Sequence, residues 1–406
     1  MSPSAPDFRS VDLTDPATFV DHDPHAFWRT VRATEPVYWH EPRQGRPGFW
    51  VVAGHSDAQA AYNNPQALSS ARGTVLEVLL RGGDSGGGRM LAVTDRPRHR
   101  ELRNLMLHAF SPRVLGEVAV KVRQCTNRLV RTVTELGSFD FATEVAEQIP
   151  MHTICDLLSI PDADRKDLLQ WNKMALSSDD PESTELDSVG ARNEIVLYFM
   201  ELAQERRDRP GDDVISMIAG AEVEGRPLSI EDVALNCYSL ILGGDESSRM
   251  SAITAVLALA ENGDQWRALR TGETGFESAV EEVLRWSTPG MHFARTATRD
   301  LVIGGRQIRT GDIVTLWNTS ANNDEAVFDA PRQFNLSRQP NKHLSFGHGL
   351  HYCIGAYLGR AELRGLLTAL VDSVESLELD GAPTRIYSNF LFGYSGLRVR
   401  FHPRAV

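Results

Sequence analysis

The chain has 406 residues, of which 42% are hydrophobic and 24% are charged, and its formal net charge is −12 at pH 7. This composition provides enough apolar surface for a sizeable core, whereas the acidic balance argues against a nucleic-acid-binding protein, which needs a basic face. The polar start, Met1 to Asp23, has no signal sequence, and the most apolar internal run is too short to span a bilayer. We therefore expect a cytoplasmic protein that is not held in a membrane.

The cysteines indicate a reducing compartment. Cys125, Cys155, Cys237 and Cys353 are widely scattered and form no C-x-x-C pair. A zinc site or a disulfide framework is therefore not expected. Taken alone, any one of them is most simply a buried structural thiol.

The first part of the chain alternates short helices and strands after an irregular lead, residues 1–25. Apolar periodicity predicts a helix over His25–Ala33 and a β-hairpin that pairs Val37–Trp39 with Phe49–Val52. The segment Ser69–Arg89 contains six glycines, five of them in two clusters, Gly82-Gly83 and Gly86-Gly87-Gly88, which favour a mobile loop. By its composition this segment is either a mobile loop with a function or a disordered connector.

The next predicted helix carries two basic side chains on one face. Asp95 is expected to cap it, and His99 and Arg103 follow at a spacing of four residues. Such a pair can bind a dianion or be ordinary solvated surface, and the spacing alone does not decide between them. From Pro112 to Arg207 the pattern is almost wholly helical, with a break at Ser178–Ser183.

A long helix is predicted to begin at the capping box of Ser229 to Asp232 and to end at Asn262. It would contain about 33 residues and extend roughly 50 Å, enough to cross the whole molecule. Gly243 and Gly244 in its middle each cost about 1 kcal/mol relative to alanine. Either a flat ligand or a packed helix crossing would explain them. The acids that follow, Asp245 and Glu246, are costly to bury without partners.

One cysteine near the C-terminal end lies in an unusual glycine-rich loop. Gly347 and Gly349 precede Cys353, and Gly355 follows it. Glycines allow backbone amides to approach the sulfur closely, and such amides stabilise a thiolate that binds a metal. A helical pattern starts at Ala356, so Cys353 would lie just before a helix N-terminus, which also favours negative charge.

The pattern F-G-x-G-x-H-x-C-x-G, from Phe346 to Gly355, resembles the haem-binding loop of the cytochrome P450 family. The resemblance implies that the Cys353 thiolate is the axial ligand of haem b, iron protoporphyrin IX. It also implies that Phe346, Gly347, His351 and Gly355 contact the cofactor. The implied fold is mainly α with a small β region, in which the long central helix crosses over the haem. One domain would include residues 1–406.

The same resemblance gives roles to other side chains. His99, Arg103, Arg295 and His351 occupy the positions that bind the haem propionates, while Gly243 and Gly244 would lie over the ring. Arg98 stands where the family usually has an acid.

Asp245, Glu246 and Ser247 match the catalytic motif that the family has in its central helix, with Glu246 as the acid and Ser247 as the alcohol. In the family these two groups deliver protons to dioxygen. Because serine lacks the methyl group of the more usual threonine, its χ1 is less restricted, and we expect leakier coupling. Family members that use peroxide have Arg-Pro at these two positions, so the acid and the alcohol favour an O₂-dependent enzyme.

Glu282 and Arg285, three residues apart, resemble the buried ion pair of the family. The family adds a third, cationic partner from a later segment, which is here Pro331-Arg332-Gln333-Phe334. This segment predicts either Gln333 as a neutral donor or Arg332 as the cation.

The expected function is a haem-thiolate monooxygenase that inserts one oxygen atom into a small, largely apolar molecule of secondary metabolism. Two alternatives stay open: a tailoring enzyme for a carrier-protein-bound substrate, and epoxidation or oxidative coupling. A haem binder without catalysis is disfavoured by Glu246 and Ser247. The expected pocket comprises Gly290, Met291, His292, Phe293, Phe390, Leu391 and Phe392.

We expect no fused flavin or iron–sulfur segment, so a separate ferredoxin and ferredoxin reductase would supply electrons. Arg98, Arg100, Arg360 and Arg364 either meet this acidic partner or are ordinary solvated arginines. We expect a monomer.

Overall fold

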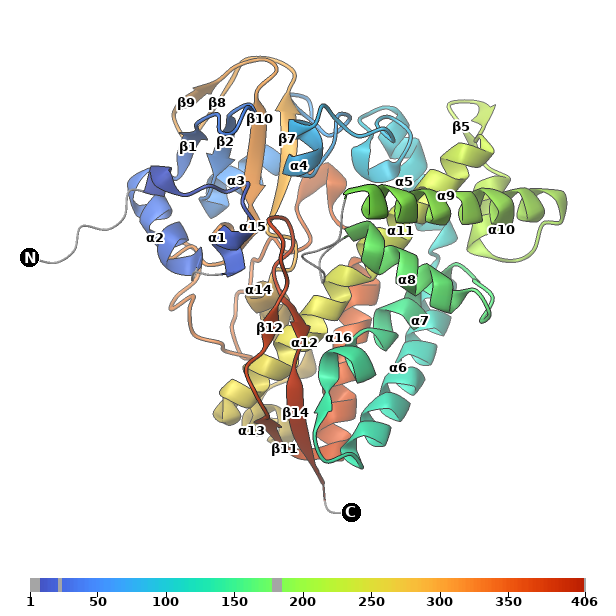
Figure 1. Cartoon of the computed structure of the whole chain (residues 1–406), viewed down its shortest axis with the longest axis vertical. Helices are drawn as coiled ribbons and strands as arrows, with labels where there is room; N and C mark the ends of the chain where they lie inside the picture. Colours follow the sequence, from blue (N-terminus) through green and yellow to red (C-terminus); the bar gives the residue numbers. More distant parts are fainter. Residues whose placement is uncertain (1–7, 21–23, 177–184, 405–406) are drawn as a thin grey trace, which may run out of the picture.

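The computed structural model describes residues 8–20, 24–176 and 185–404, and the helices and strands lie in two regions (Figure 1). The predicted break at Ser178–Ser183 lies outside the described residues. Helices form the larger region, and a mixed β-sheet forms the smaller one, on the side of the N-terminus. The predicted class, mainly α with a small β region, is confirmed.

The helices are α1 (Ala17–Val20), α2 (Pro24–Thr34), α3 (His55–Tyr62), α4 (Leu76–Leu80), α5 (Arg98–Ala109), α6 (Pro112–Thr134), α7 (Gln148–Leu157), α8 (Arg165–Leu176), α9 (Glu185–Asp208), α10 (Val214–Ala219), α11 (Ile230–Gly244), α12 (Glu246–Glu261), α13 (Gly263–Thr271), α14 (Phe276–Ser287), α15 (Asn318–Ala321) and α16 (Ala356–Ser373). Shorter helical turns are η1 (Phe8–Ser10), η2 (Leu91–Val93), η3 (Ala142–Ala146) and η4 (Gly349–His351).

The strands are β1 (Val37–His40), β2 (Phe49–Val52), β3 (Leu68–Ser69), β4 (Phe139–Asp140), β5 (Glu222–Val223), β6 (Arg226–Pro227), β7 (His292–Ala297), β8 (Leu301–Ile303), β9 (Arg306–Ile308), β10 (Ile313–Trp317), β11 (Val374–Leu379), β12 (Thr384–Arg385), β13 (Tyr394–Gly396) and β14 (Arg398–Pro403). The largest sheet has the order β1-β2-β10-β7-β3. Strands β2 and β10 are parallel, and its other pairs are antiparallel.

The predicted central helix exists, but it is broken in the middle. Ser229 caps α11 by accepting a hydrogen bond from the Asp232 N–H at 3.0 Å, as the capping box predicts. Asp245, with φ −84° and ψ −73°, separates α11 from α12, which ends at Glu261. The break immediately follows the two glycines, where helix propensity is lowest.

The start of α5 differs from the prediction. Pro97, not Asp95, precedes the helix, and no side chain caps it. The Asp95 carboxylate instead accepts hydrogen bonds from the Ser69 hydroxyl and from the Ser70 N–H, the latter at 3.0 Å. The carboxylate therefore fixes the start of the glycine-rich segment, which contains α4 and is not wholly a loop.

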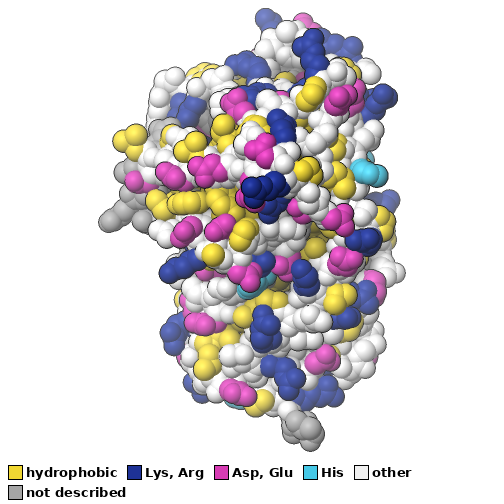
Figure 2. Space-filling model, turned by 90° about the vertical axis from the view of Figure 1, so that its right-hand side faces the viewer, with side chains coloured by type: hydrophobic (Ala, Val, Ile, Leu, Met, Phe, Trp, Pro, Cys, Tyr) yellow, Lys and Arg dark blue, Asp and Glu magenta, His cyan; other side chains and the backbone are white. Residues whose placement is uncertain are grey.

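The helical stretch after Pro112 is interrupted more often than its pattern suggests. It divides into α6, η3, α7, α8 and α9, and β4 pairs with β14 between the first two. On the face shown in Figure 2, acidic and basic side chains are interspersed rather than gathered by sign. Among the described residues, no helix combines the length and apolar character needed to cross a membrane.

Candidate active site

The cysteine loop lies between η4 and α16. The Cys353 N–H donates to the Phe346 carbonyl at 2.9 Å and closes the loop. Gly347 and Gly349 have φ values of +66° and +68°, and a Cβ on Gly349 would lie 2.7 Å from the Tyr62 carbonyl oxygen. Both the backbone conformation and the close contact therefore require glycine at position 349.

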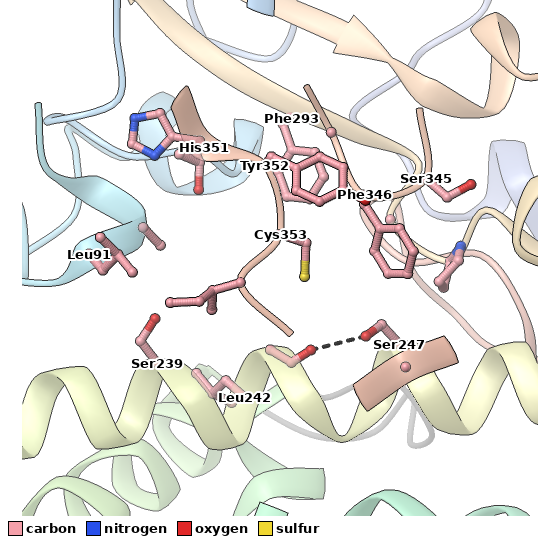
Figure 3. Close-up of a pocket in the computed structure, with 18 of the residues that line it drawn as sticks. Leu91, Ser239, Leu242, Ser247, Phe293, Ser345, Phe346, His351, Tyr352 and Cys353 are labelled. Atoms are coloured by element: carbon pink, nitrogen blue, oxygen red, sulfur yellow. Dashed lines mark hydrogen bonds between the residues drawn. The ribbon is translucent and has the colours of Figure 1, made fainter. Parts of the chain in front are cut away.

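The Cys353 sulfur points out of this loop toward the central helix (Figure 3). Burial raises the pKa of the Cys353 thiol, whereas a hydrogen bond from the Gly355 N–H and the positive charges of Arg103 and Arg360 lower it. Helix α16 begins at Ala356, as predicted. The loop thus supplies the stabilising groups that a thiolate ligand needs once a metal compensates for its burial.

Four basic side chains line one end of the same cavity. His99 and Arg103 come from α5, Arg295 from β7 and His351 from η4. The two imidazole rings lie 4.3 Å apart between centroids. Burial lowers the pKa of His99 to about 4 and that of His351 to about 2, and the neighbouring arginines act in the same direction. The two arginines therefore supply the positive charge at neutral pH.

This cluster, as described, lacks an anionic partner. Both ring nitrogens of His99 and Nε2 of His351 are buried without a hydrogen-bond partner. Arg295 donates to the Ala294 carbonyl at 2.8 Å, and neither it nor Arg103 forms an ion pair with a described carboxylate. Buried polar groups are normally satisfied, so a ligand with two carboxylates fits here. The haem propionates have this chemistry.

The central helix supplies the opposite wall. Gly243, Glu246 and Ser247 line the cavity, and the Ser247 hydroxyl donates to the Gly243 carbonyl at 3.0 Å, marked by the dashed line in Figure 3. Glu246 is 1% exposed and accepts a hydrogen bond from Arg249 at 2.7 Å. The structure therefore places the predicted acid and alcohol across the cavity from Cys353.

The charges behind Glu246 continue toward the surface. Arg249 Nη1 lies 3.8 Å from Glu147, and Glu147 forms an ion pair with Lys173 of α8 at 2.6 Å. The Lys173 side chain is 32% exposed. Arg249 and Glu147 were not predicted as site residues, because the contact depends on how η3 packs against α12.

Three residues predicted for the haem site and the catalytic group, Gly244, Asp245 and Gly355, do not line the cavity. The Asp245 carboxylate accepts a hydrogen bond from Asn172 of α8 at 2.5 Å, and burial, followed by the charge of Glu246, raises the pKa of Asp245 to about 8. A Cβ on Gly244 would face Ile154, at 3.5 Å. Gly244 and Asp245 lie about 100° and 200° around the helix axis from Gly243, which lines the cavity, so they face α7 and α8 instead.

The structure brings four of the seven residues predicted for the substrate pocket to the cavity wall. Gly290, Phe293, Phe390 and Leu391 line the cavity, whereas Met291, His292 and Phe392 do not. Met291 and Phe392 pack in the apolar cluster beside the sheet, and the His292 ring packs against Trp317 at 4.5 Å. Because neighbouring side chains on a strand point to opposite faces, Phe293 reaches the cavity and His292 cannot.

The Glu282–Arg285 pair is fully buried and bidentate, with two contacts of 2.8 Å. The predicted third partner is wrong. Neither Gln333 nor Arg332 reaches Glu282, and the cation is Arg338, whose Nε donates to Glu282 at 3.1 Å. Arg332 instead lies over the Trp286 ring. The network contains two arginines and is stronger than the sequence pattern suggests.

The four arginines considered for partner docking have different environments. Arg98 contacts Asp232 of α11 at 3.0 Å, Arg360 contacts Glu281, and Arg364 contacts Glu277. Of the four, Arg100 forms no ion pair with a described residue. Because these carboxylates offset most of the positive charge, the structure favours the view that three of them are ordinary paired arginines.

Sequence reasoning missed a buried acid behind the cavity. Glu362 of α16 is 5% exposed, and its Oε2 has no hydrogen-bond partner. The nearby hydroxyls of Ser248 and Thr153 lower its pKa, but the effect of burial is larger. Burial raises the pKa of Glu362 to about 7. Glu362 stands four residues from both Leu358 and Leu366, so the apolar periodicity of α16 could have identified it as buried.

Glu362 should make stability depend on pH. Its pKa is higher in the folded chain than the ordinary value of 4.5, so the folded state binds this proton more tightly. The stabilisation that protonated Glu362 gives the folded state is fully present below pH 4.5 and is lost as the pH rises toward 7. The side chain in Glu362→Gln stays neutral at every pH, so the variant does not lose this stabilisation. The Tm of the variant minus that of the wild type should therefore increase from pH 4.5 to pH 7. A Tm difference that does not change with pH would contradict the raised pKa.

The geometry can be compared with known proteins. Residues 276–393 match the family model described as cytochrome P450. The chain is 43% identical to cytochrome P450 NovI of Streptomyces niveus, covering 98% of each chain. It is 32% identical to a steroid C26-monooxygenase of Mycolicibacterium smegmatis, covering 91% of this chain and 89% of that one.

Solved structures agree. The crystal structure of P450 OxyD, which is involved in the biosynthesis of vancomycin-type antibiotics, has a TM-score of 0.88 and 34% identity, covering 97% of this chain and 100% of that one. The fold and the order of the motifs are therefore shared along nearly the whole chain.

Proposed function

The chain belongs to the cytochrome P450 family and is a P450 monooxygenase, and we propose that it binds haem b through the Cys353 thiolate and hydroxylates a small, largely apolar molecule with O₂. The observation that carries the proposal is the cavity itself. Cys353 points into it from one wall, Glu246 and Ser247 line the opposite wall, and basic groups without an anion lie at one end.

His99, Arg103, Arg295 and His351 would hold the two propionates, and Cys353 would hold the iron. When bound, the haem supplies the reductive activation of dioxygen, with thiolate electron density favouring O–O cleavage. The protein supplies the thiolate, the position of the substrate and the protons. NovI and OxyD support a place in secondary metabolism, and a ferredoxin-type partner is the proposed electron source.

Proton delivery is assigned to Glu246 and Ser247. The Ser247 hydroxyl lines the cavity, and it can donate its proton there when it rotates away from the Gly243 carbonyl and accept another proton in its place. Glu246 can supply that proton, and its contact with Arg249 links it to Glu147 and Lys173. General acid catalysis by such groups accelerates reactions by about 10²–10⁴-fold.

Ser247→Ala should lower product formation by about tenfold or more and raise the share of reducing equivalents lost as hydrogen peroxide, because a positioned proton donor is removed. Product, peroxide and consumed NADH are measured together. Ser247→Thr is the matched control, because it keeps the hydroxyl and restricts χ1. The share of consumed NADH that appears as product should be at least as high in this variant as in the wild type. Unchanged product and peroxide in Ser247→Ala would show that Ser247 is not the donor.

The reduced protein with bound carbon monoxide tests the central assignment. A thiolate-ligated haem gives a red-shifted absorption band, whereas a histidine-ligated haem does not. We expect this band in freshly reduced, intact protein. Its absence from protein that contains a full equivalent of haem would contradict thiolate ligation.

A further inference from the structure

The cavity is nearly uncharged away from its basic end. Among the described residues that line it, the basic groups are His99, Arg103, Arg295 and His351, which lie together at that end, and the two arginines carry the positive charge at neutral pH. The one acid, Glu246, is bound by Arg249. An anionic substrate would therefore lose its hydration without gaining a counter-ion, and burial of an unpaired charge is strongly unfavourable.

Most polar groups on the cavity face of α11 already have partners. The Asn236 side chain accepts a hydrogen bond from the Leu91 N–H at 2.9 Å and donates to the carbonyls of Arg89 and Asp232, at 3.0 and 2.8 Å. Its amide therefore holds the segment around Leu91 against α11. It has little capacity left for a ligand.

Ser239 differs from Ser247 and Ser251, which lie further along this long helical segment. Ser247 and Ser251 donate to the carbonyls four residues earlier, at 3.0 and 2.9 Å, as helix serines commonly do. Ser239 makes no such bond, and its hydroxyl has no hydrogen-bond partner among the described residues. In Figure 3 it points away from α11 and into the cavity.

The position of Ser239 relates it to the reaction site. It lies four residues before Gly243, so the two share one face of α11, and both line the cavity. Ser239 and Ser247 are eight residues apart, which corresponds to roughly 12 Å along a helix. A substrate held between them would present one end to the oxidising site and the other to Ser239.

We propose that the chain selects an uncharged, largely apolar substrate with one hydrogen-bonding group, and that Ser239 recognises this group at a distance from the oxidised carbon. This specificity rests on the proposed monooxygenase function. A free carboxylate is excluded because the cavity offers it no cation. The same acid in a neutral form, as an amide, ester or thioester, is accepted.

Ligands anchored on the haem iron through an imidazole test this directly. The probes are 6-(imidazol-1-yl)hexanamide, 6-(imidazol-1-yl)hexanoate and 1-hexylimidazole, with shorter and longer homologues. Binding is measured on the holoenzyme by the optical shift and by calorimetry at neutral pH. We expect the amide to bind at least about tenfold more tightly than the carboxylate at the best chain length, because only the carboxylate brings an unpaired charge.

Variants then locate the recognition. Ser239→Ala should weaken the amide by about threefold to tenfold, the usual effect of one lost hydrogen bond, and leave 1-hexylimidazole unchanged. Thr74→Val is the matched control, because it removes another hydroxyl that lines the cavity, and it should leave all three probes unchanged.

Two results would overturn the proposal. One is equal affinity for amide and carboxylate at every chain length. The other is an amide affinity that survives Ser239→Ala or that falls together with the affinity for the hexyl probe. The carbon monoxide band, recorded on each preparation, separates these outcomes from a failure of the proposed function, which would remove the band itself.

Discussion

Replacement of Cys353 by serine should remove the red-shifted carbon monoxide band completely and reduce monooxygenase activity below detection. Serine has nearly the same shape as cysteine, but its hydroxyl does not ionise near neutral pH, so it cannot provide an anionic sulfur donor. The iron would then lack the electron density that favours O–O cleavage. The absorption spectrum, the haem content and the rate of product formation are measured on the same preparation.

Haem retention and ligation are separate outcomes of this experiment. The cluster of His99, Arg103, Arg295 and His351 is unchanged in Cys353→Ser, so part of the haem should still bind, with an altered spectrum. Cys125→Ser is the matched control, because Cys125 is a buried free thiol on α6, outside the cavity, and it should keep both band and activity. A red-shifted band in Cys353→Ser would exclude Cys353 as the ligand.

The parts of the site that could be predicted from the sequence are those encoded by short, rigid patterns. Gly347 and Gly349 in the loop around Cys353 have positive φ values, which favour glycine, so a short stretch of sequence determines the geometry of the loop. His99 and Arg103 share a helix face whatever surrounds them. These residues meet where the patterns predict, although they are more than 200 residues apart in the chain.

The parts that could not be predicted depend on packing between distant elements. Helical periodicity places Asp245 about 200° around the axis from Gly243 and so away from the cavity, but its partner, Asn172 of α8, depends on how α8 packs against the central helix. On β7, a shift of one residue decides which face a side chain takes, so His292 and Phe293 could not be separated without the register. The second cationic partner of Glu282 could not be predicted either, because Arg338 reaches it from a loop without regular structure.

Glu282→Ala should destabilise the protein by about 3–5 kcal/mol, because it leaves two buried arginines without their anion. Arg285 is fully buried and Arg338 is nearly so. A loss of this size is a large part of the net stability of a folded protein, about 5–15 kcal/mol. The free energy of unfolding is measured by urea denaturation of the holoenzyme, with the midpoint and the slope fitted together.

The same substitution should also weaken haem retention, because the network supports the cysteine loop. Arg285 donates to the Asn322 carbonyl at 2.9 Å, and the Asn322 side chain bonds both the Leu344 N–H and the Ser345 hydroxyl, at 2.6 and 2.9 Å. Ser345 directly precedes Phe346, whose carbonyl accepts from Cys353. Faster loss of haem to an excess of an apo-globin acceptor should therefore accompany the lower stability.

Two further variants distinguish the charge of Glu282 from its shape. Glu277→Ala on the same helix removes a 74% exposed partner of Arg364, and a surface pair of this kind contributes at most about 1 kcal/mol. Glu282→Gln keeps the volume and one acceptor oxygen but not the negative charge, so its stability should lie between those of the wild type and Glu282→Ala. If Glu282→Gln were as stable as the wild type, hydrogen bonding rather than charge would hold the arginines. If Glu282→Ala cost no more than Glu277→Ala, the network would not support the fold.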